Sequence, residues 1–498
     1  MEPTKLVVLG LYVAVLFIIG IVASRRVKSM SDFYVGGKKL GFLAVAFSAR
    51  ATGESGWLLI GLTGMGALSG LSAYWVVVGE VVGVALSWWL LEQKFKRRTD
   101  QYGAITIPDY LESHFKSTKH TLRVVASVIL SVFVIIYVSS QIDVTGKAFE
   151  TMIGIDYYWG AIIGFLIVLS YIFIGGFVAA VWSDLFQGVL MFLGLVLLPI
   201  VVFFSMDGPI AIAESLNNID PALTNWFGTS DDPWFNVATM LGFACIGLGF
   251  LGSPQVYVRF MSIKNEAEID KGKWVAIIFT LLTDAAAVTI GILGRIIFTE
   301  NGQDAEAILG VGAEDVLSML TDQALPYLVS AIYVAIVLSA IMSTIDSLLV
   351  IASSAIVRDF YQKIFRPDTL DEDLAPLSRK VTLVMALMAL AIAMIIAVIS
   401  PNHTVFWLII FGWSGIAASF CPVIILSLFW KGLSETGAIA AMIAGFLSVG
   451  VFKFIIQPMD GIGAYFIQLD VLGPSFLIGM ITAYVFSKLY PAKTSVAV

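Results

Sequence analysis

Apolar and polar positions alternate along the chain in long blocks, with about thirteen apolar segments of roughly twenty residues each. The segment from Val381 to Ile399 has 19 residues and no charge, about the length that an α-helix needs to span a bilayer. The apolar runs are continuous, which excludes an outer-membrane β-barrel. We therefore predict an all-α polytopic membrane protein with about 13 transmembrane helices. The predicted segments are 4–23, 42–68, 72–91, 122–146, 158–177, 185–206, 234–256, 274–298, 326–352, 380–400, 404–430, 435–456 and 470–489.

Composition excludes other classes of protein. The chain is 59% hydrophobic and 13% charged, about half the charge of a soluble domain, and it is too apolar to be disordered. Its net charge of −7 argues against a nucleic-acid partner. Cys245 and Cys421 lie in apolar segments, which favours buried thiols over a disulfide. His114, His120 and His403 form no metal or triad spacing with them, so we do not expect an enzyme.

Basic residues predict the orientation of the chain. With an external N-terminus, 24 of the 29 Lys and Arg residues, Arg259 among them, fall in inner loops, as the positive-inside rule requires. The outer loops 207–232 and 299–323 carry eleven acids and no Lys or Arg. Only Arg50 is then left within a span. We expect a multi-pass protein of the plasma (cytoplasmic) membrane, the inner membrane of the cell, with its N-terminus outside and its C-terminus in the cytoplasm.

Two apolar segments interrupt their own helical pattern. Segment 42–68 contains Gly-Glu-Ser-Gly at residues 53–56, and segment 234–256 contains three glycines and a proline at residues 247–254. Backbone that is not helical at membrane depth is tolerated only inside protein or along a cavity. The breaks are five spans apart, an odd offset, which is typical of an inverted repeat with a site at the membrane midplane. The alternative is that the glycines only let helices pack closely.

This spacing predicts a single transmembrane transporter domain over residues 1–490. It consists of an extra N-terminal helix (4–23), a first repeat (42–206), an inverted second repeat (234–430) and two C-terminal helices (435–489). A short cytoplasmic tail (491–498) follows the domain.

The ninth segment carries a run of oxygen-bearing side chains. Ser343, Thr344, Asp346 and Ser347 lie on adjoining faces of one helix. A hard cation needs several oxygen ligands, and carbonyls freed by a broken helix can complete its shell. The alternative is that the hydroxyls bond to carbonyls of their own helix. Asp184 is a further candidate for a second cation site or cation passage, or else an N-cap of the sixth segment.

At these residues the chain resembles the sodium:solute symporter family, most closely its sodium/proline symporter branch, from about Leu6 to Tyr490. The matching stretches are DFYVGGKKLG at 32–41, SGWLLIGL at 55–62, ITIPDY at 105–110, IGGF at 174–177, SDLFQG at 183–188, GLGFLGSPQVYVRFM at 247–261 and SAIMSTIDSLLV at 339–350. The resemblance implies a leucine-transporter-like fold with a 5+5 inverted repeat.

The resemblance also implies where sodium and the solute bind. The main sodium site falls on the carbonyls of Ala51, Glu54 and Ala340 and on the hydroxyls of Ser343 and Thr344. The pocket candidates, which lie at or beside the two breaks and in the fourth segment, are Ser55, Gly56, Trp57, Tyr137, Ile246 and Phe250. Three positions depart from the proline branch, which has an aspartate at Gly53, an apolar residue at Glu54 and a tryptophan at Ile246.

Arg50 and Glu54 are spaced i,i+4 and can face each other on one helical turn. One interpretation is a buried ion pair that fixes the helix break. The other is a functional Glu54, acting as an ion ligand, a proton carrier or a counter-charge for a cationic solute. We expect Glu80, Asp143 and Asp284, the other isolated acids within spans, to be paired inside the bundle.

The sequence therefore predicts a secondary active symporter that works by alternating access. We expect an inward sodium gradient, with the proton as a further candidate ion, to drive uptake of a small organic solute, an amino acid such as proline. The alternatives are a cation or solute channel and a transporter-like sensor. The expected partners are the solute and the lipid bilayer, with no nucleic acid and no obligate protein partner.

Overall fold

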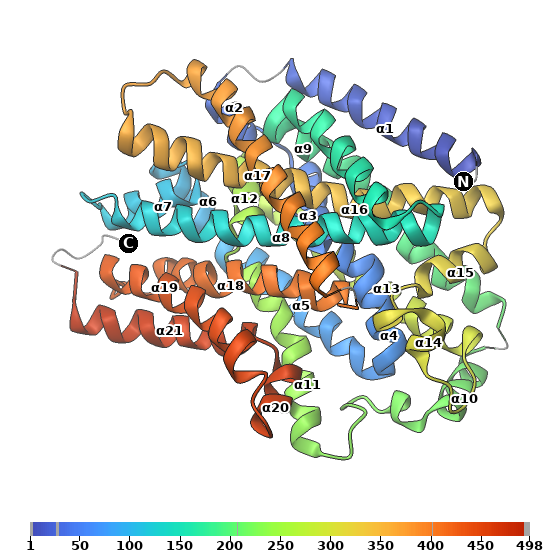
Figure 1. The fold of residues 1–498 in the computed structure, drawn as a ribbon. Helices are drawn as coiled ribbons and strands as arrows, with labels where there is room; N and C mark the ends of the chain where they lie inside the picture. Colours follow the sequence, from blue (N-terminus) through green and yellow to red (C-terminus); the bar gives the residue numbers. More distant parts are fainter. Residues whose placement is uncertain (1–2, 26–28, 207, 401, 493–498) are drawn as a thin grey trace.

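The computed structural model describes residues 3–25, 29–206, 208–400 and 402–492, and these are almost entirely helical (Figure 1). Within the described part of the chain there is no β-strand, only an isolated bridge between Leu40 and Ile263. The α-helices are α1 (Pro3–Ser24), α2 (Met30–Val35), α3 (Phe42–Gly56), α4 (Thr63–Ser69), α5 (Tyr74–Leu86), α6 (Glu92–Gln101), α7 (Ile107–Phe115), α8 (Thr121–Ile153), α9 (Tyr157–Phe204), α10 (Pro209–Ile219), α11 (Pro233–Cys245), α12 (Pro254–Ser262), α13 (Glu266–Phe298), α14 (Ala305–Leu309), α15 (Val316–Ala324), α16 (Tyr327–Ser354), α17 (Asp371–Ile399), α18 (Val405–Phe429), α19 (Glu435–Val451), α20 (Ile462–Leu469) and α21 (Leu472–Leu489).

Shorter helical segments with 3-10 or π geometry join or extend these helices. They are η1 (Gly36–Lys38), η2 (Trp57–Leu62), η3 (Gly70–Ala73), η4 (Ser87–Leu91), η5 (Pro221–Thr224), η6 (Ile246–Leu251), η7 (Val311–Ala313), η8 (Ala355–Phe365) and η9 (Phe452–Ile456). Arg26, Lys28 and residues 493–498 of the expected tail lie outside the described residues.

Polar caps set where several helices begin. The hydroxyls of Ser29, Thr106 and Ser434 and the amide oxygen of Asn265 each accept a backbone N–H of the first helical turn. Such caps satisfy amide groups that have no partner within the helix. The caps thus fix the starts of the long helices α13 and α19 and of the short helices α2 and α7.

Within the described residues, eleven helices are long and apolar enough to cross a membrane. The difference from thirteen apolar segments has two sources. The predicted segments 42–68 and 72–91 form one helical stretch, interrupted at Gly70 by non-helical dihedral angles of φ 57° and ψ −133°. The segment predicted at 158–177 corresponds to a shorter apolar helix, Tyr157–Tyr171. The chain is therefore an all-helical, multi-pass membrane protein, as the sequence predicts.

The helices differ strongly in how much of their apolar surface is buried. In the spans that contain α16 and α18, 83% of an apolar 18-residue stretch is buried inside the protein. In the spans that contain α1, α17 and α19, the buried share is 28%. Large apolar side chains such as Leu11, Leu387 and Phe454 remain exposed on the outer helices, as expected for surfaces that face lipid. The central helices α16 and α18 therefore carry the residues that face other protein groups rather than lipid (Figure 1).

Small residues let one helix approach the second predicted break closely. A Cβ atom at Gly79 or Gly83 of α5 would collide with the backbone of Ala244 or Gly247. Backbone approach of this kind is typical of helix packing in membranes. As a result, α5 lies directly against the end of α11 and the start of η6.

Both predicted helix breaks are present. In the first, Ser55 has φ 38° and ψ −166° at the end of α3, which is a strained conformation for a residue with a side chain. In the second, α11 ends at Cys245 and η6 leads to α12, which begins at Pro254. The breaks face each other, because a Cβ atom at Gly53 would lie 2.7 Å from the Phe250 ring.

Candidate cation and substrate site

The first break frees backbone carbonyls that an intact helix would use. The N–H of Gly56 donates to Oε1 of Gln141 on α8 at 3.1 Å instead of to the carbonyl of Thr52. The side-chain amide of Gln141 also lies 3.3 Å from the Ser55 hydroxyl, to which Tyr137 donates at 3.4 Å. Helix α8 therefore stabilises the break and leaves carbonyl oxygens unoccupied by the helix.

Oxygen atoms of α3 and α16 converge at this break. The Ser343 hydroxyl lies 3.0 Å from the carbonyls of both Ala51 and Ala340. The Thr344 hydroxyl lies 3.1 Å from the carbonyl of Thr52 and 3.3 Å from that of Ala340. All five residues are buried. Five neutral oxygens at such spacings are a donor set that a hard cation can accept.

Four of the five predicted cation ligands, Ala51, Ala340, Ser343 and Thr344, lie at these contacts. The carbonyl of Glu54, the fifth, accepts the N–H of Trp57. The carbonyl of Thr52, which was not predicted, accepts from the Thr344 hydroxyl. The position of Thr52 within the predicted break indicates that its carbonyl could be a ligand. Which of the neighbouring carbonyls faces Thr344, however, depends on the dihedral angles of the broken turn, which the sequence does not specify.

Asp184 lies beside this site and is held by Arg259. The guanidinium Nη2 of Arg259 is 3.1 Å from Oδ2 of Asp184 and also contacts the Ser347 hydroxyl, while its Nε donates to Ser48 at 2.8 Å. Arg259 is fully buried in α12, so its assignment to an inner loop was wrong. The N-cap alternative for Asp184 is also wrong, because α9 runs through this position as a helix. Asp346 instead accepts from Ser347 at 3.0 Å.

Arg50 and Glu54 form a buried ion pair. The Nε and Nη2 atoms of Arg50 donate to Oε1 of Glu54 at 3.0 and 2.7 Å. Oε2 of Glu80 on α5 lies 3.5 Å from the same guanidinium, which also lies over the Phe250 ring at 4.4 Å from its centroid. On α13, Oδ1 of Asp284 lies 3.3 Å from the Thr283 hydroxyl, which is 3.4 Å from both carboxylate oxygens of Glu54, and all these side chains are buried.

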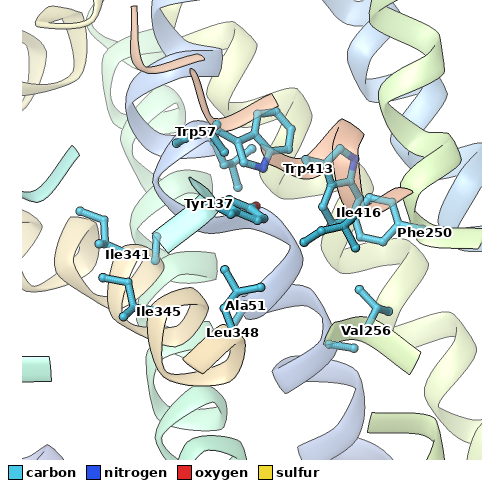
Figure 2. Close-up of a cluster of buried hydrophobic side chains, with 14 of the residues drawn as sticks. Ala51, Trp57, Tyr137, Phe250, Val256, Ile341, Ile345, Leu348, Trp413 and Ile416 are labelled. Carbon is cyan, nitrogen blue, oxygen red and sulfur yellow. The ribbon is translucent and has the colours of Figure 1, made fainter. Parts of the chain in front are cut away.

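Aromatic side chains from several helices form a buried cluster beside the two breaks (Figure 2). Three predicted residues, Trp57, Tyr137 and Phe250, belong to it together with Trp413, whose ring centroid lies 5.0 Å from that of Phe250. The indole N–H of Trp57 donates to the carbonyl of Gly53 at 3.1 Å, and that of Trp413 to the carbonyl of Ile246 at 3.0 Å. Trp413 was missed, because it lies in an ordinary apolar segment of α18 with no break or charge to mark it.

A polar network connects the C-terminal part of α8 with the loops that precede α15 and α18. Nε2 of His403 lies 2.9 Å from Asp143, and Lys147 donates to the carbonyl of His403 at 2.8 Å. Lys147 also lies 3.7 Å from Glu314, which accepts the N–H of Phe406. The expected pairing of Asp143 inside the bundle is thus present.

Two groups of this network lie outside the membrane-spanning segments and have altered pKa values. Burial raises the pKa of Glu314 to about 7. Burial would lower the pKa of His403, but the hydrogen bond and negative charge of Asp143 outweigh it and raise the pKa of this imidazole above its ordinary value.

A second ionic network joins helices at the opposite end of α8. Arg123 contacts Asp109, at 2.9 Å, and Glu112 on α7, and it also contacts Asp359 on η8. Thr106 donates to the same Asp359 at 2.8 Å. The site between the breaks therefore lies between two polar networks, each joining helices that are distant in sequence.

Known proteins share both this sequence and this fold. The chain is 33% identical over 473 residues to the high-affinity proline transporter PutP of Bacillus subtilis (strain 168), which covers 92% of this chain and 97% of that protein. It is 32% identical over 484 residues to sodium/proline symporter 2 of Staphylococcus saprophyticus, with 96% and 91% covered. Its fold matches that of a Na+-coupled sialic acid symporter in a substrate-bound outward-open state, with a TM-score of 0.78, 18% identity and 99% of both chains covered.

The family model described as the sodium:solute symporter family matches residues 33–445. This match spans most of the chain, including both helix breaks and the oxygen-rich part of α16. Together with the fold, it confirms a transporter rather than an enzyme, and the chain belongs to the sodium:solute symporter family.

Proposed function

We propose that the protein is a sodium-coupled symporter that takes a small amino acid, such as proline, into the cell by alternating access. The observation that carries this proposal is the group of five neutral oxygens between the first break and α16. Calcium sites usually include carboxylates, so an uncharged shell of this kind favours a monovalent hard cation. The proline transporters among its relatives support the choice of solute.

In this proposal, sodium binds the carbonyls of Ala51, Thr52 and Ala340 and the hydroxyls of Ser343 and Thr344. Each hydroxyl has one proton and two lone pairs, so its proton can turn away from the α3 carbonyl while a lone pair faces the ion. The ion would replace hydroxyl–carbonyl bonds that join α3 to α16. Sodium binding would thereby change the contact between these two helices, which is what coupling to a solute requires.

Asp184, Asp346 and Ser347 extend the polar path along α16 beyond the sodium site. In the proposal they guide the cation or hold a second one. The support is that Asp184 lies next to Thr52, whose hydroxyl is 3.5 Å from its carboxylate. Arg259 neutralises Asp184 in this arrangement, so a second cation would have to displace a guanidinium.

The solute is proposed to bind between the two breaks, against Trp57, Tyr137, Phe250 and Trp413, with Ser55, Gly56 and Ile246 supplying backbone and hydroxyl groups. Aromatic faces suit the apolar part of an amino acid. The polar backbone of the broken helices suits its ammonium and carboxylate groups. The aromatic rings are almost fully buried here, as a closed site would require.

The proposed orientation places the N-terminus outside and the C-terminus in the cytoplasm of the plasma membrane. The N- and C-terminal ends lie at opposite ends of the helical bundle (Figure 1), which supports an odd number of crossings. Repeats over 42–206 and 234–430 remain part of the proposal, and the facing breaks support them. The acid-rich loops 207–232 and 299–323 would then be external.

For Glu54, the contacts favour a structural role over that of a proton carrier. Two short hydrogen bonds from Arg50 to one carboxylate oxygen stabilise the ionised form of Glu54. We therefore propose sodium as the ion that binds at the break, with Glu54 as the fixed partner of Arg50.

The proposal can be tested by solute uptake into proteoliposomes. An inward sodium gradient should accumulate the solute against its own gradient, whereas a channel would only equilibrate it. In Ser343→Ala and Thr344→Ala, the sodium concentration for half-maximal uptake should rise about tenfold or more, because a bond to a charged group is worth about 1.5–3 kcal/mol.

Ser353→Ala is the matched control. Ser353 is equally buried on the same helix, but its hydroxyl bonds only to the carbonyl of Val350. Its sodium dependence should match that of the wild type. Unchanged sodium dependence in both site variants would contradict the proposed cation site.

A further inference from the structure

Behind the first helix break, two buried carboxyl groups contact Arg50, and a third lies on the far side of the Thr283 hydroxyl from Glu54. Glu54 is paired with Arg50, and Oε2 of Glu80 points to the same guanidinium at 3.5 Å. Asp284 is the third acid. Both carboxyl oxygens of Glu80 and the Oδ2 atom of Asp284 lack a hydrogen-bond partner among the described residues. Both side chains are fully buried and do not reach the bulk solvent.

The hydroxyl of Thr283 lies between two of these acids. Its oxygen is 3.4 Å from both carboxylate oxygens of Glu54, 3.3 Å from Oδ1 of Asp284 and 2.7 Å from the carbonyl of Phe279. A hydroxyl has a single proton, so it donates to only one of these oxygens at a time. Thr283 therefore cannot satisfy Glu54 and Asp284 together, and a proton on Asp284 would supply a further donor at this point.

The charge of the group leads to the same conclusion. With all three acids ionised, the group would carry two negative charges in excess of Arg50. Burying one uncompensated charge costs several kcal/mol even after relaxation. The other titratable group that faces the cluster is Tyr137, on α8 near Glu80, and it supplies no positive charge. Two protons would make the group neutral.

A metal ion fits this place less well. No cluster of three or more His, Cys, Asp or Glu side chains in the described parts of the chain has the geometry to hold a metal ion. A proton needs only one acceptor at hydrogen-bonding distance, and a protonated Asp284 has the hydroxyl oxygen of Thr283 at 3.3 Å from its Oδ1.

We infer that Glu80 and Asp284 form a proton-binding site beside the helix break, in which each acid holds a proton while Glu54 remains ionised against Arg50. The site links transport to pH, because opening the bundle would admit water and let both acids ionise. It goes beyond the proposed sodium site, and it rests on the proposed symport only for the uptake measurement.

The direct test is infrared spectroscopy of the purified full-length protein, which resolves the carbonyl stretch of protonated carboxylic acids. Near neutral pH, Glu80→Gln and Asp284→Asn should each remove part of this absorption from the wild-type spectrum. Asp231→Asn, at an exposed loop position, is the matched control and should leave it unchanged. A spectrum unaffected by both buried variants would overturn the proton site, whatever uptake shows.

Uptake and sodium binding give the second test. An amide resembles a neutral acid, so Glu80→Gln and Asp284→Asn should change sodium-driven uptake by less than about tenfold. The double variant should keep its uptake at alkaline pH, where wild-type uptake falls. Loss of one bound sodium ion, measured with radioactive sodium, in a folded Asp284→Asn would overturn the inference and identify a metal site. Failure of wild-type uptake with an intact infrared result would instead count against the proposed symport.

Discussion

Removing Arg50 should damage the protein more than removing Glu54, although the two side chains form one ion pair. Among the described residues, Arg50 is the cationic side chain that pairs with Glu54 and Glu80, so Arg50→Met leaves Glu54 ionised without a partner. Glu54→Met leaves a guanidinium that still has Glu80 at 3.5 Å. Breaking a buried pair by removing one partner costs about 3–5 kcal/mol. We expect Arg50→Met at the upper end of this range and Glu54→Met at or below the lower end.

The double variant Arg50→Met with Glu54→Met should recover most of the loss. It removes both charges and leaves two apolar side chains of similar size, and such replacements of buried pairs are often neutral or stabilising. Glu80 and Asp284 then remain, and both can be neutral. The coupling energy between the two positions should therefore be large and favourable to the pair.

Thermal unfolding of detergent-purified protein measures this order. A loss of 1 kcal/mol shifts Tm by about 2–4 °C in domains of 150–250 residues. For a chain about twice that size, we expect roughly 3–10 °C for the single variants. The exposed pair Arg97–Glu266 is the control, since removing both partners of an exposed pair costs about 1 kcal/mol or less. A double variant no better than Arg50→Met, or a Glu54→Met protein that is the less stable single variant, would refute the reasoning.

Three further predictions concern the pocket, the outer network and the buried guanidinium. Trp57→Ala and Tyr137→Ala should raise the KM for the solute about fivefold or more, because they remove tens of Å² of apolar contact at about 25 cal/mol/Å²; equal KM with lower thermal stability would indicate core packing instead. Folding raises the pKa of Glu314 to about 7 and that of His403 above its ordinary value, so both groups bind protons more tightly in the folded protein. The stability that these two groups contribute is therefore greatest in acid. The contribution of Glu314 is lost as the pH rises from the pKa of this carboxyl in the unfolded chain to its folded pKa of about 7. The contribution of His403 is lost as the pH rises through the raised pKa of its imidazole in the folded protein. Glu314→Gln should flatten the pH dependence of Tm measured between about pH 5 and pH 8, and an unaltered slope would contradict this account. Arg259→Met should leave a buried aspartate unpaired and lower Tm, whereas Arg259→Lys should retain part of the stability, and equal Tm values for the two would argue against the ion pair.

The sequence predicts the parts of the fold that depend on local chemistry. Glycines at residues 53–56 and 247–254 mark both breaks, because such clusters disfavour a continuous apolar helix. The hydroxyls of Ser343 and Thr344 mark the face of α16 that meets the first break. These signals are readable because each lies within a single short stretch of chain.

Contacts between distant segments could not be predicted in this way. The bond between Arg259 and Asp184 joins residues 75 positions apart, and the position of Arg259 near a helix end made it resemble a loop residue. Trp413 enters the pocket only because α18 packs beside η6. Which carbonyl of the broken turn faces Thr344 depends on the strained dihedral angles of Ser55, which no residue pattern specifies.

The backbone contact between α5 and the second broken helix has a mechanical consequence. Gly79 and Gly83 leave no side chain between these two elements. Because backbone touches backbone, α5 and the second broken helix have no flexible side chains between them, and one cannot shift without moving the other. Glu80 lies on the same turn of α5, and its carboxyl faces Arg50 on the first broken helix. Any rocking of η6 relative to α3 would therefore move Glu80 with η6 and change the distance between its carboxyl group and the guanidinium of Arg50.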